Sequence, residues 1–296
     1  MSPTPPRFEY DESVKSDVSD EFINVYLQRP LAGLVTRAVY RFPVTPNHLT
    51  FAAIFFGIGG SLALSLGEPH FTAAALLFYL KDLLDSADGQ LARAKKLFSR
   101  RGRFLDSIGD FAVSCCLFFG LFTVMMRENY TPALSFFAAF FGFWGMTLRV
   151  SYHVFYQTSF LHTRRKYEIN RITEEILPQD FHEDGTTVRL QKIFLFLYGW
   201  QDRMMLRLDA WSRGNCGALS RDELTQWYRD VIGLRLGGLL GFGTEFVVLT
   251  LCLLLQRPGI YFIFTLGIFN CLWAAAIGYR RILLSDRIIE GRTMNR

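Results

Sequence analysis

Long apolar stretches separated by short polar segments dominate this chain of 296 residues. An α-helix needs about 20 residues to cross the roughly 30 Å of hydrocarbon in a bilayer. Six stretches reach or approach that length, at residues 47–67, 71–93, 103–126, 131–156, 232–256 and 259–279. The pattern therefore predicts an all-α, polytopic membrane protein with six transmembrane helices.

An amphipathic segment precedes the first of these stretches. Between residues 20 and 42, apolar residues recur at helical spacing and three arginines are interleaved with them. This pattern predicts a juxtamembrane helix lying along the bilayer surface, with an ordinary packed helix as the alternative. Pro30 is expected to kink or split it, because proline lacks an amide donor. Thr45-Pro46-Asn47 then marks the entry to the first span, with Asn47 as a good N-cap residue.

The polar segments complete the predicted layout. Residues 1–19 form a polar tail, 157–230 an insert between the fourth and fifth spans, and 280–296 a basic tail. The first four spans thus fall within 47–156 and the last two within 232–279. Residues 190–200 of the insert are apolar but too short to span a bilayer. We expect one or two cytoplasmic helices in the insert, some of them on the lipid surface.

Charge sets the predicted orientation. The chain has 32 Lys and Arg against 27 Asp and Glu, a net charge of +5, and basic residues gather before the first span, after the second and in the C-terminal tail. The opposite loops, 67–70, 127–132 and 256–259, have at most one basic residue each. The positive-inside rule therefore predicts that both termini are cytoplasmic. The basic charge indicates a leaflet surface and no nucleic-acid partner, since no nucleic-acid motif is present.

Cysteines and the N-terminus exclude some classes. The five cysteines have no metal-ligand spacing, and four of them lie in apolar stretches, so we interpret those four as packing or lipid-facing thiols. The polar N-terminal sequence predicts no cleavable signal peptide.

Four carboxylates stand where a membrane makes charge expensive. Asp85 and Asp88 share one helical face, as do Asp106 and Asp110, and a short basic loop joins the two helices. The helices are therefore expected to be antiparallel neighbours, with the four acids converging near their cytoplasmic ends. An acid at the centre of a bilayer costs about 2.5–3.5 kcal/mol on insertion scales, so the cluster needs compensating cations.

Bound metal ions fit that requirement best. The nearby protein cations, Lys81 and Arg93, are too few for four acids. Carboxylate oxygens suit hard ions such as Mg²⁺ or Mn²⁺, and no His or Cys in the cluster suggests zinc. Two such ions would clamp a diphosphate, and the small residues Gly89, Ala92 and Gly102 leave room for a base or phosphate. The alternative is a buried ion-pair network that only packs two helices.

The same stretch resembles the signature of the CDP-alcohol phosphotransferases. That signature reads D-x-x-D-G-x-x-A-R, about eight residues, then G-x-x-x-D-x-x-x-D. All eight fixed positions are present, as Asp85, Asp88, Gly89, Ala92, Arg93, Gly102, Asp106 and Asp110. The family's P-N-x-x-T occurs at 46–50, and the six predicted spans and the juxtamembrane helix also match. The resemblance covers 20–156 well and the last two spans loosely, and it does not cover the insert.

The resemblance implies a role for each matched residue. Asp85, Asp88 and Asp106 would bind two divalent cations, Mg²⁺ or Mn²⁺, with Asp110 completing the set and accepting the proton of the acceptor hydroxyl. Arg93 would face the phosphates of a CDP pocket. The other residues implied at that pocket are Asn47, Thr50, Gly89, Ala92, Ser99 and Gly102.

The resemblance also implies the reaction and the partners. A substituted phosphate, phosphatidyl or phospho-alcohol, would pass from a CDP-linked donor to an alcohol acceptor with release of CMP. Such chemistry belongs to phospholipid or related phosphodiester biosynthesis. Membrane lipids are expected partners, and a homodimer is implied because the family tends to be dimeric. The insert could be a lid, an element that selects the acceptor, or a passive elaboration.

Other residues in the spans leave alternatives open. Lys81 could contact the acceptor or a phosphate, or pair with Asp85 one turn later. Arg149 could hold an anionic group of the acceptor or extend to the interface. Glu245 could have a packing partner such as Asn270, a water, or a role with substrate. Small-residue spacing at Gly233, Gly237 and Gly241 favours helix packing within the chain, with a dimer face as the alternative. His48 and His153 are interpreted as structural.

Two other classes compete with the transferase. A membrane prenyltransferase also binds a diphosphate through aspartates and metal, but it would separate two aspartate motifs by over a hundred residues on about nine spans. An ion-coupled transporter would use intramembrane acids and usually show an inverted repeat. No repeat between the halves of this chain is evident.

Overall fold

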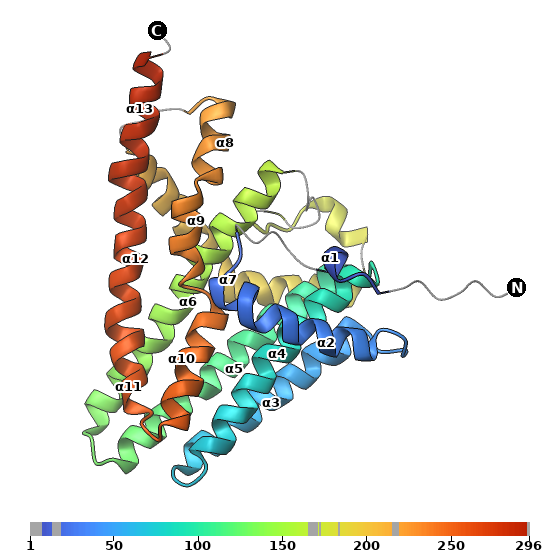
Figure 1. Ribbon diagram of the computed structural model, residues 1–296, viewed down its shortest axis with the longest axis vertical. Helices are drawn as coiled ribbons and strands as arrows, with labels where there is room; N and C mark the ends of the chain where they lie inside the picture. The colour runs from blue at the N-terminus through green and yellow to red at the C-terminus, as the bar shows by residue number, and fades with distance from the viewer. Residues whose placement is uncertain are drawn as a thin grey trace, which may run out of the picture.

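The computed structural model describes residues 8–13, 19–164, 171, 173–182, 184–214 and 219–294. These residues form helices and connecting loops without a β-strand, which confirms the all-α prediction (Figure 1). Five helical segments within these described ranges are long and apolar enough to cross a membrane, which supports the prediction of a polytopic membrane protein.

The first four predicted spans are continuous helices. They are α3 (Pro46–Leu66), α4 (Phe71–Ala94), α5 (Arg100–Arg127) and α6 (Pro132–Thr163). Among them α4 does not qualify as a span by composition. It is 24 residues long, but Lys81, Asp82, Asp85, Asp88 and Arg93 interrupt its apolar sequence. The length of α4 agrees with the predicted span at 71–93, and only its charged residues keep it from qualifying as a span.

The last two predicted spans are interrupted helices. α9 (Val231–Gly238) and α10 (Phe242–Leu254) together make one candidate span. The other candidate span, Gly259–Ile289, runs through five consecutive helical segments and ends within the last of them. These segments are α11 (Gly259–Phe262), η4 (Ile263–Ile268), α12 (Phe269–Gly278), η5 (Tyr279–Leu284) and α13 (Ser285–Met294). The helix break at residues 239–241 was not expected from the sequence.

Close packing within the chain accounts for the glycines beside that break. A Cβ on Gly238 would lie 3.1 Å from the carbonyl oxygen of Asp20, and one on Gly243 would collide with Asn24. The segment before α2 therefore fits against these glycines. Of the three glycines in the predicted packing motif, Gly241 lies in the same way against Glu21, and Gly233 lies against Arg280, so contacts within the chain occupy both.

The N-terminal helical segment is divided beside Pro30. A short α1 (Tyr10–Ser13) is followed by η1, a π-helix (Asn24–Gln28), and then by α2 (Arg29–Val39) with Pro30 in its first turn. The change of helix type accommodates the missing proline donor. The position of α2 at a bilayer surface stays a prediction.

Local capping fixes where the helices begin. Thr45, and not Asn47, caps α3, because Thr45 and His48 form a reciprocal capping box and Pro46 is the first helical residue. The N-cap prediction for Asn47 was wrong by two positions, and the structural interpretation of His48 agrees with this cap. At the start of α5, the hydroxyl of Ser99 accepts the amide of Gly102 at 3.0 Å.

The arrangement of α3, α4 and α5 positions the candidate site. α3 packs closely against both α4 and α5, whereas α4 and α5 approach each other much less closely. The two signature helices are antiparallel, as expected, but they face each other mainly through side chains. A core of buried apolar residues from α3, α4, α5, α6 and α10, including Phe78, Leu117, Met146 and Phe246, holds this arrangement.

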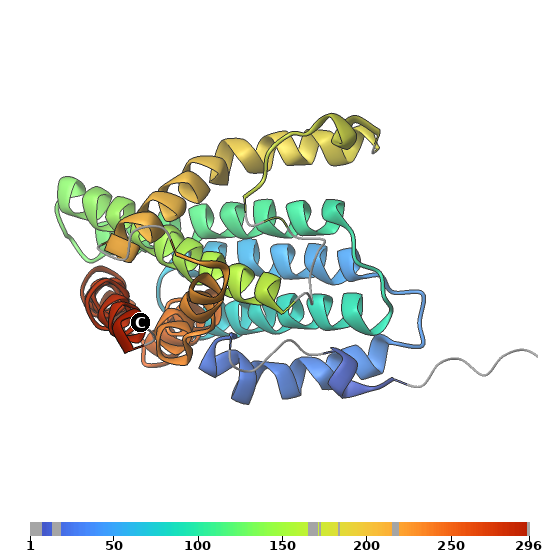
Figure 2. The same ribbon diagram turned by 90° about the horizontal axis from the view of Figure 1, so that it is seen from above.

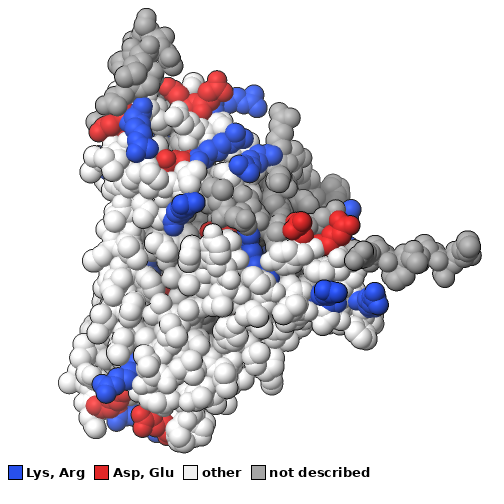
Figure 3. Space-filling view, in the orientation of Figure 1, with Lys and Arg blue, Asp and Glu red and all other residues white. Residues whose placement is uncertain are grey.

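The insert contributes η2 (Pro178–His182), α7 (Gly185–Arg213) and α8 (Arg221–Arg229). α7 packs against α5 and α6, and α2 packs against α4. Figure 2 shows α7 and α2 on opposite sides of the layer formed by α3, α4 and α5. On the face drawn in Figure 3, charged side chains lie mainly in the upper half and at the lowest tip, with a nearly uncharged band between them.

Candidate active site

Three aspartates of the signature converge between α4 and α5. Asp85, Asp88 and Asp106 each offer a carboxylate oxygen, and these atoms lie within 4.8 Å of one another. Asp88 is buried, while Asp85 and Asp106 are partly exposed. Two residues come from α4 and one from α5, so carboxylate oxygens of both helices meet, as the spacing predicted for these three of the four acids.

Asp110, one turn further along α5, belongs to an ion pair. Its carboxylate lies 2.6 Å from the Nζ of Lys81, which is 1% exposed. The same Nζ is 3.7 Å from Asp85, so the predicted pair at i, i+4 is present but is the longer of the two. The ring of Phe246 lies beside this ammonium group, 4.9 Å from ring centroid to Nζ.

The charge around the cluster is unbalanced. Within the described part of the chain, Lys81 pairs with Asp85 and Asp110, and no ion pair involves Asp88 or Asp106. Burying uncompensated carboxylates together is unfavourable. The donor set consists of carboxylate oxygens, which suits a hard divalent cation such as Mg²⁺ or Mn²⁺. Asp85, Asp88 and Asp106 are therefore the residues that fit a metal site.

Residues at the start of α3 lie against the cluster and the α5 cap. The hydroxyl of Thr50 donates to the carboxylate of Asp88 at 2.5 Å. The Oδ1 of Asn47 lies 3.1 Å from where a Cβ on Gly102 would be, and Ser99 Oγ lies 3.0 Å from that point. Asn47, Ser99 and Gly102 are thus neighbours, and a side chain at position 102 would crowd both polar groups.

Arg93 lies in the last turn of α4, whereas Lys81 lies near the middle of that helix. Its guanidinium covers Gly89, with Nη1 3.4 Å from where a Cβ on Gly89 would be. Its Nε donates to the carbonyl oxygen of Ser13, next to α1. Ala92, which precedes it, is half-buried. The sequence pattern did not predict this contact between Arg93 and Ser13 of the N-terminal segment.

Arg149 lies in a separate polar cluster. It is fully buried, it pairs with Glu245, and its Nη1 donates to Asn270 at 2.6 Å and to the carbonyl oxygen of Thr265 at 2.9 Å. Tyr261 donates to the other oxygen of Glu245 at 2.8 Å. Arg149 therefore neither extends to the interface nor offers its guanidinium to an acceptor. Glu245 is thus held by Arg149 and Tyr261, and not by the packing partner Asn270 that the sequence suggested.

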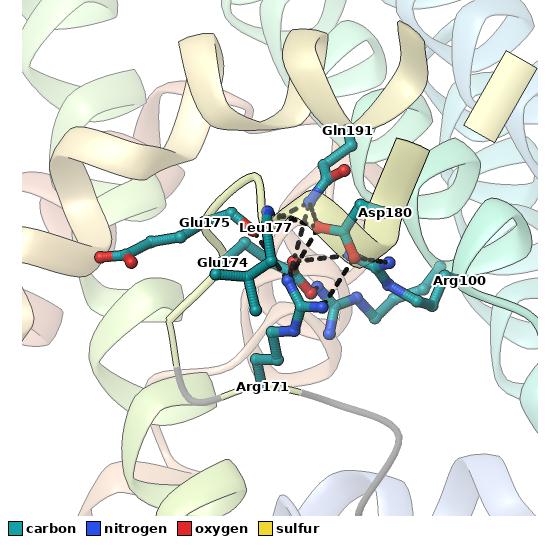
Figure 4. A network of polar contacts seen from close by, with 8 residues as sticks. Arg100, Arg171, Glu174, Glu175, Leu177, Asp180 and Gln191 are labelled. Atoms are coloured by element: carbon teal, nitrogen blue, oxygen red, sulfur yellow. Dashed lines mark hydrogen bonds and ion pairs between the residues drawn. The ribbon is translucent and has the colours of Figure 1, made fainter. Parts of the chain in front are cut away.

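A network of charged residues ties the insert to the start of α5 (Figure 4). Arg100 donates to Asp180 at 2.8 Å and to Glu174 at 3.1 Å, and Arg103 also pairs with Glu174. Hydrogen bonds from Arg171 and other donors hold the pKa of Asp180 well below its usual range. Arg100 and Arg103 counted as leaflet-facing charge in the sequence, but they bind buried acids of the insert.

The insert also contacts α5 within the signature. The hydroxyl of Tyr198 on α7 donates to the carbonyl oxygen of Ser107 at 3.0 Å. Its ring meets that of Phe111 edge to face at 5.9 Å. Ser107 and Phe111 directly follow Asp106 and Asp110, so α7 supports the helix that presents both acids.

The fold and this cluster define an integral membrane protein with a candidate site for divalent cations between two helices. Residues 43–168 match the family model for CDP-alcohol phosphatidyltransferase. The match covers the whole signature and the first four predicted spans, and it confirms the resemblance seen in the signature.

Two curated relatives have the same name. The chain is similar to the "Bifunctional IPC transferase and DIPP synthase" of Thermococcus kodakarensis, with 34% identity over 91 residues, 31% of this chain and 20% of the relative. The protein of that name from Archaeoglobus fulgidus is 31% identical over 115 residues, 39% of this chain and 22% of the relative. The chain thus spans about a fifth of the length of the curated relatives it matches.

Proposed function

We propose that this protein is a divalent-metal-dependent membrane transferase. It would move a substituted phosphate from a CDP-linked donor to an alcohol acceptor and release CMP. The observation that carries the proposal is the convergence of Asp85, Asp88 and Asp106 within a segment that matches the CDP-alcohol phosphatidyltransferase family. Neither the prenyltransferase nor the transporter alternative has such support.

The acids divide into two roles in this proposal. Asp85, Asp88 and Asp106 would hold the cations. Asp110 differs from them because it forms the short ion pair with Lys81. Cations held there would supply electrostatic stabilisation of the diphosphate and of the CMP that leaves. Asp110 accepts the proton of the acceptor hydroxyl, because a hydroxyl at neutral pH needs a positioned base. The ion pair with Lys81 supports this role, since it fixes the carboxylate of Asp110 in one place. A contribution of Asp110 to the metal set is part of the same proposal.

The nucleotide end is assigned to residues around the starts of α3 and α5 and the end of α4. The proximity of Asn47, Ser99 and Gly102 supports this assignment. Arg93 would face the phosphates once it exchanges its contact with Ser13 for the donor. Thr50, Gly89 and Ala92 complete the proposed CDP pocket. In the transfer, the oxygen of the acceptor forms a bond to the phosphorus of the transferred group, and the bond from that phosphorus to the bridging oxygen of CDP breaks.

We infer an orientation with both termini and the site on the cytoplasmic side. The distribution of basic residues among the loops supports it. A role in phospholipid or related phosphodiester biosynthesis follows from the donor class. A homodimer is also proposed, on the tendency of the family alone.

Release of CMP tests the proposed activity. The purified protein is supplied with Mn²⁺ or Mg²⁺, with CDP-diacylglycerol or a CDP-linked polar alcohol, and with a panel of alcohol acceptors. We expect CMP release from one donor class, dependent on both metal and acceptor. Asp106→Asn should abolish it, whereas Asp222→Asn, at an exposed acid on α8, should not. Metal-independent release, full activity of Asp106→Asn, or no release from any donor and acceptor pair would contradict the proposal.

A further inference from the structure

The outward face of α7 carries a continuous stripe of apolar and basic side chains. Its apolar members are large and exposed, with Ile193 at 45%, Phe196 at 82%, Trp200 at 36% and Trp211 at 52% exposure. Its basic members are also exposed and recur at helical spacing beside them, as Arg189, Lys192, Arg203 and Arg207. We call these eight residues the α7 stripe. Exposed apolar side chains flanked by Lys and Arg suit a membrane interface, where the long basic side chains extend to the head groups while the apolar ones enter the hydrocarbon boundary.

Acidic side chains on α7 point away from the stripe. Asp202 is partly buried, and Asp209 is fully buried, where it accepts hydrogen bonds from Tyr156 and Trp227. No acidic residue of α7 is exposed in its described range, 185–213. The exposed charges that α7 presents are therefore all basic.

The apolar side of the stripe continues onto a transmembrane helix. The ring of Trp200 meets that of Trp144 on α6 at 5.4 Å between centroids. α6 is a candidate span, and Phe137 and Phe141 on it are 53% and 57% exposed. Large exposed apolar side chains on a span face acyl chains, so the apolar side of α7 continues the lipid-facing surface of α6.

The opposite face of α7 is fixed against the protein. The ring of Phe194 packs on Phe104 of α5 at 5.3 Å, and Tyr198 bonds to the backbone of α5. Gln191 donates to Asp180 at 3.0 Å, which joins α7 to the charged network shown in Figure 4. These contacts prevent rotation of α7 about its own axis, so the α7 stripe remains on the exposed face of the helix.

We propose that the α7 stripe binds the head groups of anionic lipids. Phe196 and Trp200 enter the boundary between head groups and acyl chains, and Arg189, Lys192, Arg203 and Arg207 contact the anionic groups. Charge complementarity selects an anionic leaflet as the occupant, because basic residues near a bilayer surface are attracted by negatively charged lipids. The binding gives the insert a membrane-docking role beyond the proposed transfer reaction.

Native mass spectrometry of the full chain in detergent tests the binding. Phosphatidylglycerol and phosphatidylcholine serve as the anionic and zwitterionic probes. The test variant replaces all four basic stripe residues with Gln. The matched control removes the same charge from exposed positions outside α7, as Arg41→Gln, Lys96→Gln, Arg221→Gln and Arg235→Gln. The four stripe substitutions should weaken phosphatidylglycerol binding by at least about tenfold, while the control retains most of it.

The same spectra separate the rival occupant. Equal phosphatidylglycerol binding by wild type and stripe variant, or an equal loss in the control variant, would overturn the proposal. So would a dimer that dissociates only in the stripe variant, since it would identify a second copy as the occupant.

A second measurement does not depend on the charge substitutions. In nanodiscs whose lipids carry bromine on the acyl chains, the emission of Trp200 should be quenched, seen as a smaller quenched fraction in Trp200→Phe than in the wild type. Equal quenching in both proteins would contradict insertion. Neither experiment requires turnover, so the docking role can fail while the proposed activity stands, and the reverse.

Discussion

The Nζ of Lys81 lies closer to Asp110 on α5, at 2.6 Å, than to Asp85 on its own helix, at 3.7 Å. The ion pair therefore bridges the two signature helices where their backbones are well separated. Lys81 is 1% exposed, so its charge is held inside the protein among carboxylates and aromatic rings. It links the stability of the helix pair to the position of the proposed base.

Lys81→Met should destabilise the protein and abolish CMP release. Removing one partner of a buried pair leaves the other charge uncompensated, at a cost of about 3–5 kcal/mol. Thermal unfolding in detergent measures the loss. The double variant Lys81→Met, Asp110→Asn should recover much of the stability and none of the activity. A single variant as stable as the wild type would show that the pair contributes little.

Asp110→Asn should stop turnover and leave nucleotide binding nearly intact. The amide keeps the shape of the side chain but cannot accept a proton from the acceptor. CMP release and binding of a CDP-linked donor are measured on the same preparation, with Asp222→Asn as the control. Retained turnover would refute the assignment of Asp110 as base.

Thr50→Val should weaken metal binding, because Thr50 donates to Asp88 and orients its carboxylate. Loss of a group that orients a metal ligand typically costs about 10–100-fold in affinity. A Mn²⁺ titration of the protein without nucleotide measures the change. Thr50→Ser keeps the hydroxyl and should bind Mn²⁺ nearly as the wild type does; an equal loss in both variants would assign the effect to packing.

Local spacing was enough to predict the helices and the convergence of the acids. Apolar runs of bilayer length predicted the positions of the main helices. Spacings of three and four residues predicted that Asp85 shares a helix face with Asp88, and Asp106 with Asp110. The same reasoning counted α4 among six spans despite its charges, and those charges keep it from qualifying as a span by composition.

Partners distant in sequence could not be predicted in the same way. Periodicity indicates which face of a helix is buried, but not which residue of another helix meets it. Arg149 and Glu245 are 96 positions apart, and Arg100 meets Asp180 from 80 positions away. Each arginine, taken alone, could as well have faced an interface or an anionic substrate. Only the tertiary structure decides between those roles, because it places α6 against η4, with Arg149 reaching Glu245 of α10, and the insert against α5.

Arg149→Met should lower stability by about 3–5 kcal/mol, since it leaves Glu245 buried without its cation. Thermal unfolding in detergent is again the measurement. The double variant Arg149→Met, Glu245→Leu should regain much of the loss because it removes both charges. That variant should also keep its KM for the acceptor, because the guanidinium is occupied by protein groups. A raised KM in the stable double variant would restore Arg149 as an acceptor contact.

Glu21 should make stability depend on pH in an unusual direction for a carboxylate. It is buried before α2, where it accepts the amide of Thr244 at 2.9 Å, and burial together with the nearby Asp20 raises its pKa from 4.5 to about 8. The fold favours the neutral form, so this contribution to stability is complete below pH 4.5 and is lost as the pH rises through about 8. Glu21→Gln cannot ionise and should remove this decline. Thermal unfolding of both proteins across roughly pH 5 to 9 measures the difference, and parallel pH profiles would show that Glu21 does not carry it.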